Sequence, residues 1–229
     1  MNPGDFHLHY VEKGAGEPLI LLHGNGEDSA YFVHQIEYFS PHYRVIAVDT
    51  RGHGQSPRGS APFTIRQFAE DLLAFMDERA IARAHILGFS DGGNIAMIFA
   101  LRHPERVNRL VLNGANLNAR GVKPLVQLPI EIGYHIARCF AEKSPEARRN
   151  AEMLGLMVND PNVSPEALEA LHVPTLVIAG TRDMIRTAHT RLIAERLPDA
   201  ELVLLPGDHF IANRQHEVFN RAVERFLRA

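Results

Sequence analysis

The chain has 229 residues, 45% of them hydrophobic and 22% charged, which predicts one compact domain, with or without a modest insertion, around a full core. Its 24 basic and 27 acidic side chains give a formal net charge of −3. No long run of lysine or arginine is present to neutralise phosphates, so we do not expect a nucleic-acid partner.

Short apolar runs rich in β-branched residues alternate with longer helical patterns along the chain. This alternation is typical of a doubly wound α/β protein, in which helices cover both faces of a mostly parallel sheet. The earliest strands are candidates for antiparallel pairing. The predicted strands are Leu8–Val11, Leu19–Leu22, Val45–Val48, His85–Leu87, Leu110–Leu112, Thr175–Ala179 and Leu202–Leu205.

Three segments predict helices that pack on this sheet. Thr64–Arg79 carries apolar residues three and four positions apart, which places one apolar stripe along a helix. Thr187–Arg196 and Gln215–Leu227 show the same spacing.

The connection from Asn113 to Pro174 is much longer than the usual few residues plus one covering helix. It contains an apolar segment around Leu125–Phe140, a predicted helix from about Pro145 to Val158, and a short predicted helix from about Pro165. We therefore predict a core formed by residues 1–113 and 174–229, and a small helical lid formed by residues 114–173.

The strongest sign of chemistry is the segment Gly88-Phe89-Ser90-Asp91-Gly92, between a predicted strand and the predicted helix Gly93–Leu101. A sharp strand-to-helix turn holds its serine in strained backbone dihedrals and exposes the hydroxyl at the carboxyl edge of the sheet. The flanking glycines avoid collisions in such a turn. The alternative is that Ser90 simply caps the helix.

A serine hydroxyl needs a base to take its proton, and the base needs an acid to orient it. Asp183 comes just past one predicted strand and His209 just past the next, so both lie at the same edge of the sheet as Ser90. The chain order Ser90, Asp183, His209 is the order expected for nucleophile, acid and base on successive strands. Asp208 is a weaker candidate acid, since adjacent side chains rarely turn toward each other.

Acyl transfer also requires two N–H donors that stabilise the oxyanion. The backbone N–H of Asp91, at the start of the predicted helix, is one candidate. The backbone N–H of Asn25, in the loop His23-Gly24-Asn25-Gly26 after the second strand, is the other. An ordinary glycine-rich loop is the alternative reading of that segment.

Together these motifs resemble the α/β-hydrolase family. The resemblance rests on Leu-Leu-His-Gly at 21–24, the loop 49–56, Gly-Phe-Ser-Asp-Gly-Gly at 88–93, Asp183 and His209, and covers nearly the whole chain. It implies a doubly wound sheet of about eight strands, a Ser-His-Asp triad that uses neither cofactor nor metal, and a helical lid between strands six and seven. The pattern yields one strand fewer, which indicates a shortened N-terminal part.

The predicted function is that of a serine hydrolase that cleaves a small-molecule ester or related acyl compound through an acyl-enzyme on Ser90. Dehalogenases and epoxide hydrolases of the family carry aspartate at the nucleophile position and are disfavoured. C–C bond hydrolysis of the meta-cleavage type and acyl transfer to an alcohol remain alternatives. A ligand-binding, receptor-like protein that kept the fold is the non-enzymatic one.

Asp91 raises a separate substrate-binding hypothesis. Many relatives have an apolar or amide residue directly after the nucleophile, whereas this chain has a carboxylate. That charge can attract a cationic substrate such as an aminoacyl ester. The alternative is that Asp91 interacts with the helix dipole and points away from substrate.

The remaining features predict a cytoplasmic protein. The one cysteine, Cys139, cannot form an intramolecular disulfide or a thiolate metal site, and we expect it to be buried in the lid. His7 and His9 share a strand face without a third metal ligand, so we expect exposed strand residues and no metal. The N-terminus lacks the pattern of a signal peptide, and no segment approaches the roughly 18 apolar residues of a membrane span.

Overall fold

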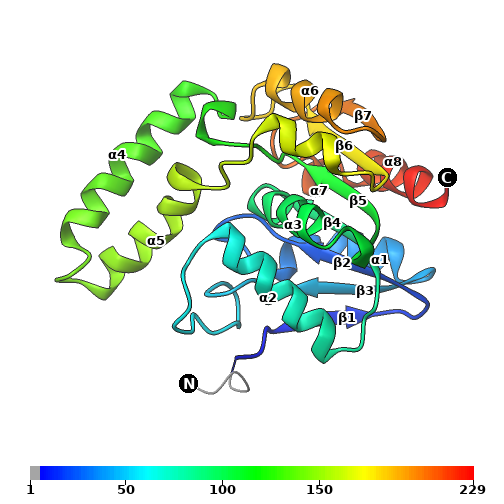
Figure 1. Cartoon of the computed structure of the whole chain (residues 1–229), viewed down its shortest axis with the longest axis horizontal. Coiled ribbons are helices and arrows are strands. Elements are labelled where there is room, and N and C mark those ends of the chain that lie inside the picture. The colour runs from blue at the N-terminus through cyan, green and yellow to red at the C-terminus, as the bar shows by residue number, and fades with distance from the viewer. Residues whose placement is uncertain (1–5) are drawn as a thin grey trace.

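The computed structural model describes residues 6–229 and contains a seven-stranded, mostly parallel sheet with helices on both faces (Figure 1). The spatial order of the strands is β1-β3-β2-β4-β5-β6-β7. β1 pairs antiparallel with β3, and the other neighbours pair parallel. The strands are β1 (Tyr10–Lys13), β2 (Glu17–Leu22), β3 (Tyr43–Val48), β4 (Ala84–Phe89), β5 (Val107–Asn113), β6 (Thr175–Gly180) and β7 (Ala200–Leu205).

This architecture confirms the predicted doubly wound sheet. Because the described residues form seven strands and not eight, the long insertion follows the fifth strand of this chain, β5, and precedes β6. The strand that would come first in an eight-stranded sheet has no counterpart within residues 6–229.

The first strand begins two residues later than its apolar pattern predicts. Its ladder with β3 opens at the pair Tyr10 and Val48, while Leu8 is buried just before the strand. His9 also precedes the strand, and its Nδ1 lies 2.8 Å from the Oδ2 of the buried Asp49. His9 is therefore tied to the loop after β3 and is not an exposed strand residue.

The helices form two layers over the sheet. α2, α3 and α6 pack on one face, in the larger of two hydrophobic clusters, and α1 and α8 pack on the other. The three helices predicted to pack on the sheet by their apolar spacing are confirmed as α2, α6 and α8, and the side-chain hydroxyl of Thr64 caps α2 by accepting the Gln67 N–H. The helices are α1 (Val33–Phe39), α2 (Ile65–Glu78), α3 (Asp91–Arg102), α4 (Pro124–Phe140), α5 (Pro145–Asn159), α6 (Thr187–Arg196), α7 (Ile211–Arg214) and α8 (His216–Arg228).

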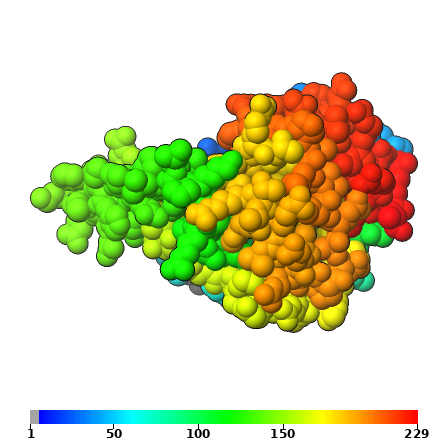
Figure 2. Space-filling view, turned by 90° about the horizontal axis from the view of Figure 1, so that it is seen from above, coloured from blue at the N-terminus to red at the C-terminus, as the bar shows by residue number. Residues whose placement is uncertain are grey.

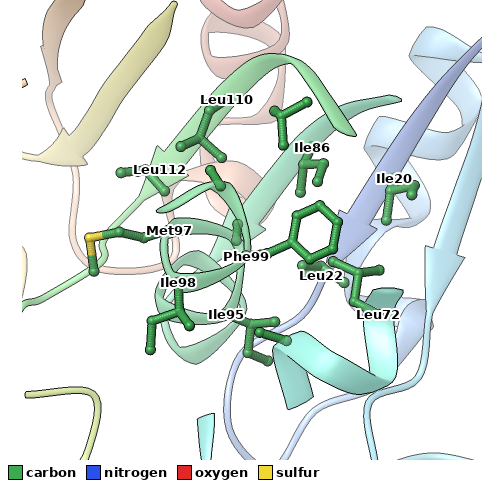
Figure 3. Packing of buried hydrophobic residues seen from close by; sticks show 14 of the residues in the cluster. Ile20, Leu22, Leu72, Ile86, Ile95, Met97, Ile98, Phe99, Leu110 and Leu112 are labelled. Atoms are coloured by element: carbon green, nitrogen blue, oxygen red, sulfur yellow. The ribbon is translucent and has the colours of Figure 1, made fainter. Parts of the chain in front are cut away.

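Helix α3 is buried on nearly every side. Figure 3 shows Ile95 and Phe99 of α3 against Leu22 and Ile86 of the sheet, with Leu72 of α2 beside them. All residues from Asp91 to Ala100 are buried. Because close-packed interiors resist displacement, the N-terminus of α3, where Ser90 lies, is fixed relative to the sheet.

α4 and α5 pack on each other as a helical hairpin that projects from the body (Figures 1 and 2). The chain after the hairpin returns to the body: Val163, Leu168 and Leu171 belong to the main core cluster, and the last two lie in or beside the 3₁₀ helix Pro165–Ala170. The projecting part is thus shorter than the range 114–173 expected for the lid.

The outer side of α4 is apolar and exposed. Leu125 is 91% exposed, and Leu128, Ile132, Ile136 and Phe140 are each more than half exposed. Cys139, on the same helix, is exposed as well. The expectation that Cys139 is buried was wrong, because the hairpin consists of α4 and α5 and no third layer within residues 6–229 covers the outer side of α4.

Candidate active site

The structure brings Ser90, His209 and Asp183 together at the carboxyl edge of the sheet. Ser90 joins β4 to α3, Asp183 follows β6, and His209 follows β7. The Nε2 of His209 lies 3.0 Å from the Oγ of Ser90, and its Nδ1 lies 2.7 Å from the Oδ1 of Asp183. The three side chains form one hydrogen-bonded series with the serine at its outer end.

The backbone at Ser90 is strained, as the sequence motif predicts. Ser90 has φ 53° and ψ −119°, outside the regions that side-chain-bearing residues normally occupy. A Cβ at Gly88 would lie 2.2 Å from the carbonyl oxygen of Gly92, and one at Gly92 would lie 2.0 Å from that of Leu22. Within the described residues the Ser90 hydroxyl caps no helix N–H, so simple helix capping does not explain this serine.

Asp183 is placed to orient His209. Its carboxylate is almost completely buried, and Oδ1 also accepts the Ile185 backbone N–H at 2.9 Å. An acceptor at Nδ1 favours the tautomer whose Nε2 is free to take a proton from Ser90. Asp208, the weaker candidate, accepts the Phe210 N–H at 2.9 Å and pairs with Arg214, so it shapes the turn instead.

Gly114 is a site residue that the sequence analysis missed. It follows β5 directly and has φ +62°. A Cβ there would lie 2.8 Å from Cε1 and 3.0 Å from Nδ1 of His209, which is closer than real Cβ contacts allow. The signal in the sequence is a glycine immediately after a buried strand, at the sheet edge where Ser90 and His209 were expected.

The loop that carries Asn25 is fixed from two sides. The buried His23 lies within hydrogen-bond distance of the Gly24 carbonyl through Nδ1, at 2.7 Å, and accepts the Thr50 N–H through Nε2, at 3.0 Å. Burial lowers the pKa of His23, which favours this neutral, bonded form. The side-chain amide of Asn25 donates to the carbonyl of Met153 in α5 at 2.7 Å, so the loop also contacts the hairpin.

Glu27 is a second residue that the sequence analysis missed. Its Oε2 accepts the backbone N–H of Gly24, in the Asn25 loop, at 3.2 Å. Burial raises the pKa of Glu27 to about 7. Beside it, the ring of Tyr31 stacks on Phe89, with centroids 4.5 Å apart. A single glutamate in a glycine-rich loop carries no pattern from which this environment could be predicted.

The side chain of Asp91 is buried beside the nucleophile. Its Oδ1 accepts a hydrogen bond from the amide of Asn94 at 3.3 Å, whereas its Oδ2 is buried and accepts none from residues 6–229. Burial and, to a smaller extent, the nearby carboxylate of Asp160 raise the pKa of Asp91 to about 6, against the lowering effects of Asn94, His209 and Asn25. A carboxylate with an open acceptor thus adjoins Ser90.

A cavity of about 400 Å³ lies where α5 of the hairpin meets the body. The cavity lies between the loop after β3, which contributes Arg58 and Phe63, and α5, which contributes Glu152 and Met153. An ion pair of 2.7 Å between Arg58 and Glu152 spans it. Within the described part of the chain, no three histidine, cysteine or acidic side chains are grouped as metal ligands, and no helix is long and apolar enough to cross a membrane.

A family model described as the alpha/beta hydrolase fold matches residues 17–135 of the chain. The chain belongs to the α/β-hydrolase family. Among curated proteins, the putative carbamate hydrolase RutD of a Caulobacter species is 31% identical, with 96% of this chain and 94% of that protein covered. The 3-oxoadipate enol-lactonase 2 of Acinetobacter baylyi is 29% identical, with 98% and 94% covered.

Solved structures give the same assignment. The enol-lactonase from Burkholderia xenovorans is 26% identical with a TM-score of 0.79, and 99% of this chain and 98% of that one are covered. The meta-cleavage product hydrolase from Pseudomonas fluorescens is 28% identical with a TM-score of 0.79, and 96% and 94% are covered. This α/β-hydrolase is therefore an enzyme whose relatives hydrolyse several kinds of small molecule.

Proposed function

We propose that this α/β-hydrolase is a serine hydrolase that cleaves a small-molecule ester or a related acyl compound. The observation that supports it most is the hydrogen-bonded series from Ser90 through His209 to Asp183, with distances of 3.0 and 2.7 Å. A strained serine with a base and a buried acid behind it is the arrangement that activates a hydroxyl for attack on a carbonyl carbon.

In the proposed reaction the Oγ of Ser90 attacks the carbonyl carbon while His209 takes its proton. The backbone N–H groups of Asn25 and Asp91 stabilise the oxyanion of the tetrahedral intermediate. His209 then gives the proton to the leaving alcohol, and an acyl-enzyme remains on Ser90. Water, deprotonated by His209, attacks the acyl-enzyme and releases the acid, with Asp183 orienting the imidazole throughout.

The substrates named for the relatives include a lactone and a carbamate, which are acyl compounds open to the same chemistry. C–C bond hydrolysis is the second candidate, favoured by the structural similarity to a meta-cleavage product hydrolase. A dienoic keto-acid substrate of that class is an anion, and the carboxyl groups of Asp91 and Asp160 disfavour an anion close to Ser90. Acyl transfer to an alcohol would use the same acyl-enzyme.

A fluorophosphonate probe followed by intact-mass analysis tests the proposal. We expect one adduct on the wild type, no adduct on Ser90→Ala, and greatly slowed labelling of His209→Ala. Asp208→Asn is the matched control, because its carboxyl adjoins His209 in sequence but pairs with Arg214, and it should label at the wild-type rate. A folded wild type that takes up no probe would contradict the proposal.

The proposal includes a small-molecule substrate and a cytoplasmic location. The location rests on the sequence features described above, and fractionation of cells that produce the protein tests it. Recovery of the protein outside the cytoplasm would contradict that part without affecting the proposed chemistry.

A further inference from the structure

The residue directly after the proposed nucleophile carries a buried carboxylate with one open acceptor. The residue Asp91 is 7% exposed, and its Oδ2 accepts no hydrogen bond within residues 6–229. Buried polar atoms in folded proteins nearly always have a partner. Within the described residues the Oδ2 of Asp183 lacks a partner as well, but that of Asp91 belongs to the residue that follows the reacting serine, where a donor that arrives with the substrate can bind it.

Asp91 is held in place by a network of amides. The side-chain amide of Asn94 donates to Asp91 Oδ1 and, at 3.1 Å, to the side-chain oxygen of Asn116. In return, the backbone N–H of Asn116 donates to the side-chain oxygen of Asn94 at 2.9 Å. Since Oδ1 is bound to this network, the carboxylate has a fixed direction and leaves Oδ2 available.

The surroundings of Asp91 are more acidic than basic. The strongest charged influence on it is a second carboxyl, that of Asp160, followed by His209. The side-chain amide of Asn25 also stabilises the carboxylate and lowers its pKa, although the short hydrogen bond of this amide, at 2.7 Å, goes to the hairpin carbonyl of Met153. The negative charge is thus balanced mainly by dipoles, and an added positive charge would be attracted to this position.

Covalent geometry places this carboxylate close to the reaction centre. The backbone N–H of Asp91 is the proposed oxyanion donor, and the side chain of the same residue reaches only about 4 Å from that nitrogen. An uncompensated carboxylate there would repel the oxyanion of the transition state. A cation bound to Asp91 cancels this repulsion, so its effect on rate exceeds its effect on binding alone.

We propose that Asp91 selects substrates whose acyl group carries an ammonium group next to the scissile carbonyl, as in an α-amino ester. This inference rests on the proposed serine hydrolase function and names its substrate class. The alternative, in which Asp91 only complements the dipole of α3, leaves Oδ2 unexplained, because the bond that Asp91 accepts comes from a side chain and not from a backbone N–H of the first turn.

The test compares alanyl, lactoyl and propionyl esters of one alcohol at pH 7, where the α-amino group is largely protonated. We expect the wild type to show kcat/KM for the alanyl ester at least tenfold above that for the propionyl ester, with the neutral lactoyl ester between them. Asp91→Asn keeps the shape of the side chain and removes its charge, and should lower the alanyl-to-propionyl ratio at least tenfold. Asp208→Asn is the matched control, because it removes the same charge from a carboxyl that pairs with Arg214, and it should change the ratio less than threefold.

Each outcome decides the inference. Equal rates for the alanyl and propionyl esters in the wild type would overturn it even if the Asp91→Asn protein fails to fold, as would an unchanged ratio in a folded Asp91→Asn variant. A lactoyl ester cleaved as fast as the alanyl ester would assign Asp91 to a neutral hydroxyl donor and overturn the requirement for a cation. A wild type that cleaves none of the esters and takes up no fluorophosphonate would instead contradict the proposed function itself.

Discussion

The turn at Ser90 and the hairpin of α4 and α5 are held in opposite ways. Ser90 begins a helix that is buried from Asp91 to Ala100, whereas α4 exposes five large apolar side chains. The turn is fixed by backbone contacts that leave no room for a Cβ, whereas α4 and α5 pack mainly on each other and meet the body at the base of the hairpin and through side chains of α5. The difference separates a rigid part that holds the proposed chemistry from a projecting hairpin whose outer side is exposed.

The base of the hairpin joins these two parts. The backbone N–H of Lys123 donates to the carbonyl of Met184 at 2.9 Å, and that of Arg186 to the carbonyl of Gly121 at 2.8 Å. Met184 directly follows Asp183, so the start of α4 is tied to the loop that carries the proposed acid. On the α5 side of the hairpin, the carbonyl of Met153 accepts the hydrogen bond from the side-chain amide of Asn25. The hairpin therefore touches both sides of the proposed site.

The largest effect on activity is expected at Gly114, where the packed residues leave no space for a Cβ. Gly114→Ala should lower kcat about 100-fold or more, because the new methyl group displaces the His209 ring from hydrogen-bond reach of Ser90. Gly16→Ala is the control: its φ is also positive, at +107°, but its Cβ would meet only one carbonyl oxygen at 3.4 Å. Steady-state kinetics on a shared ester, with circular dichroism to check folding, measures both. Near-normal kcat in Gly114→Ala would show that the site is less rigid than described.

A smaller effect is expected where the hairpin meets the site. Asn25→Ala keeps the backbone N–H and removes the hydrogen bond to Met153, so kcat/KM should fall about tenfold as the loop loses its support. Glu152→Gln weakens the partly exposed ion pair with Arg58 and should change kcat/KM less than threefold. Equal losses in the two variants would mean that hairpin attachment in general, and not the Asn25 contact, sets the activity.

Glu27 provides a pH-dependent comparison. Its folded-state pKa of about 7 lies above the ordinary value of 4.5, so the folded protein binds more protons than the unfolded one between these values and loses stability as the pH rises through them. The Glu27→Gln variant has no carboxyl at this position to ionise, so it does not lose stability in this way. Relative to the wild type, the variant should gain about 1–2 kcal/mol of unfolding free energy between pH 4.5 and 8, after allowance for partial exposure. Urea titrations at both pH values measure this, and a constant difference would contradict it.

The smallest effect is expected on the outer side of α4. Ile132→Gln changes a side chain that is 53% exposed, so the unfolding free energy should stay within about 0.5 kcal/mol of the wild type. Leu156→Ala, in α5, is the matched contrast, because Leu156 is 1% exposed within the main core cluster, and its loss should cost about 2–5 kcal/mol. Thermal or urea unfolding distinguishes them. A large loss in Ile132→Gln would show that the outer side of α4 is covered in solution.

Most of the fold and the positions of the proposed catalytic residues could be predicted from the sequence, because they depend on local patterns. The apolar runs and three-four spacings located the strands and helices, and the Gly88–Gly92 motif located the strained turn. The positions of Asp183 and His209 followed from strand order, since parallel strands present their carboxyl ends at one edge. Their proximity in the structure agrees with that reasoning.

The remainder depends on contacts between distant segments. Gly114 matters because a ring from residue 209 lies against it, and Glu27 because other segments bury its carboxyl. Cys139 was expected to be buried because cysteine usually is, but exposure depends on whether another layer covers the helix. The return of Leu168 and Leu171 to the core likewise depends on tertiary packing. None of these environments leaves a periodic pattern in the sequence.

Because the proposed catalytic residues follow strands that are far apart in the sequence, the recovery of hydrolysis can be used to follow refolding. Ser90, Asp183 and His209 follow β4, β6 and β7, and β7 is one of the two edge strands of the sheet. Contacts so far apart in the sequence form late when a chain refolds. Spectroscopic signals from the sequence-local α4–α5 hairpin should therefore recover before turnover does, and the return of turnover would time the docking of β7.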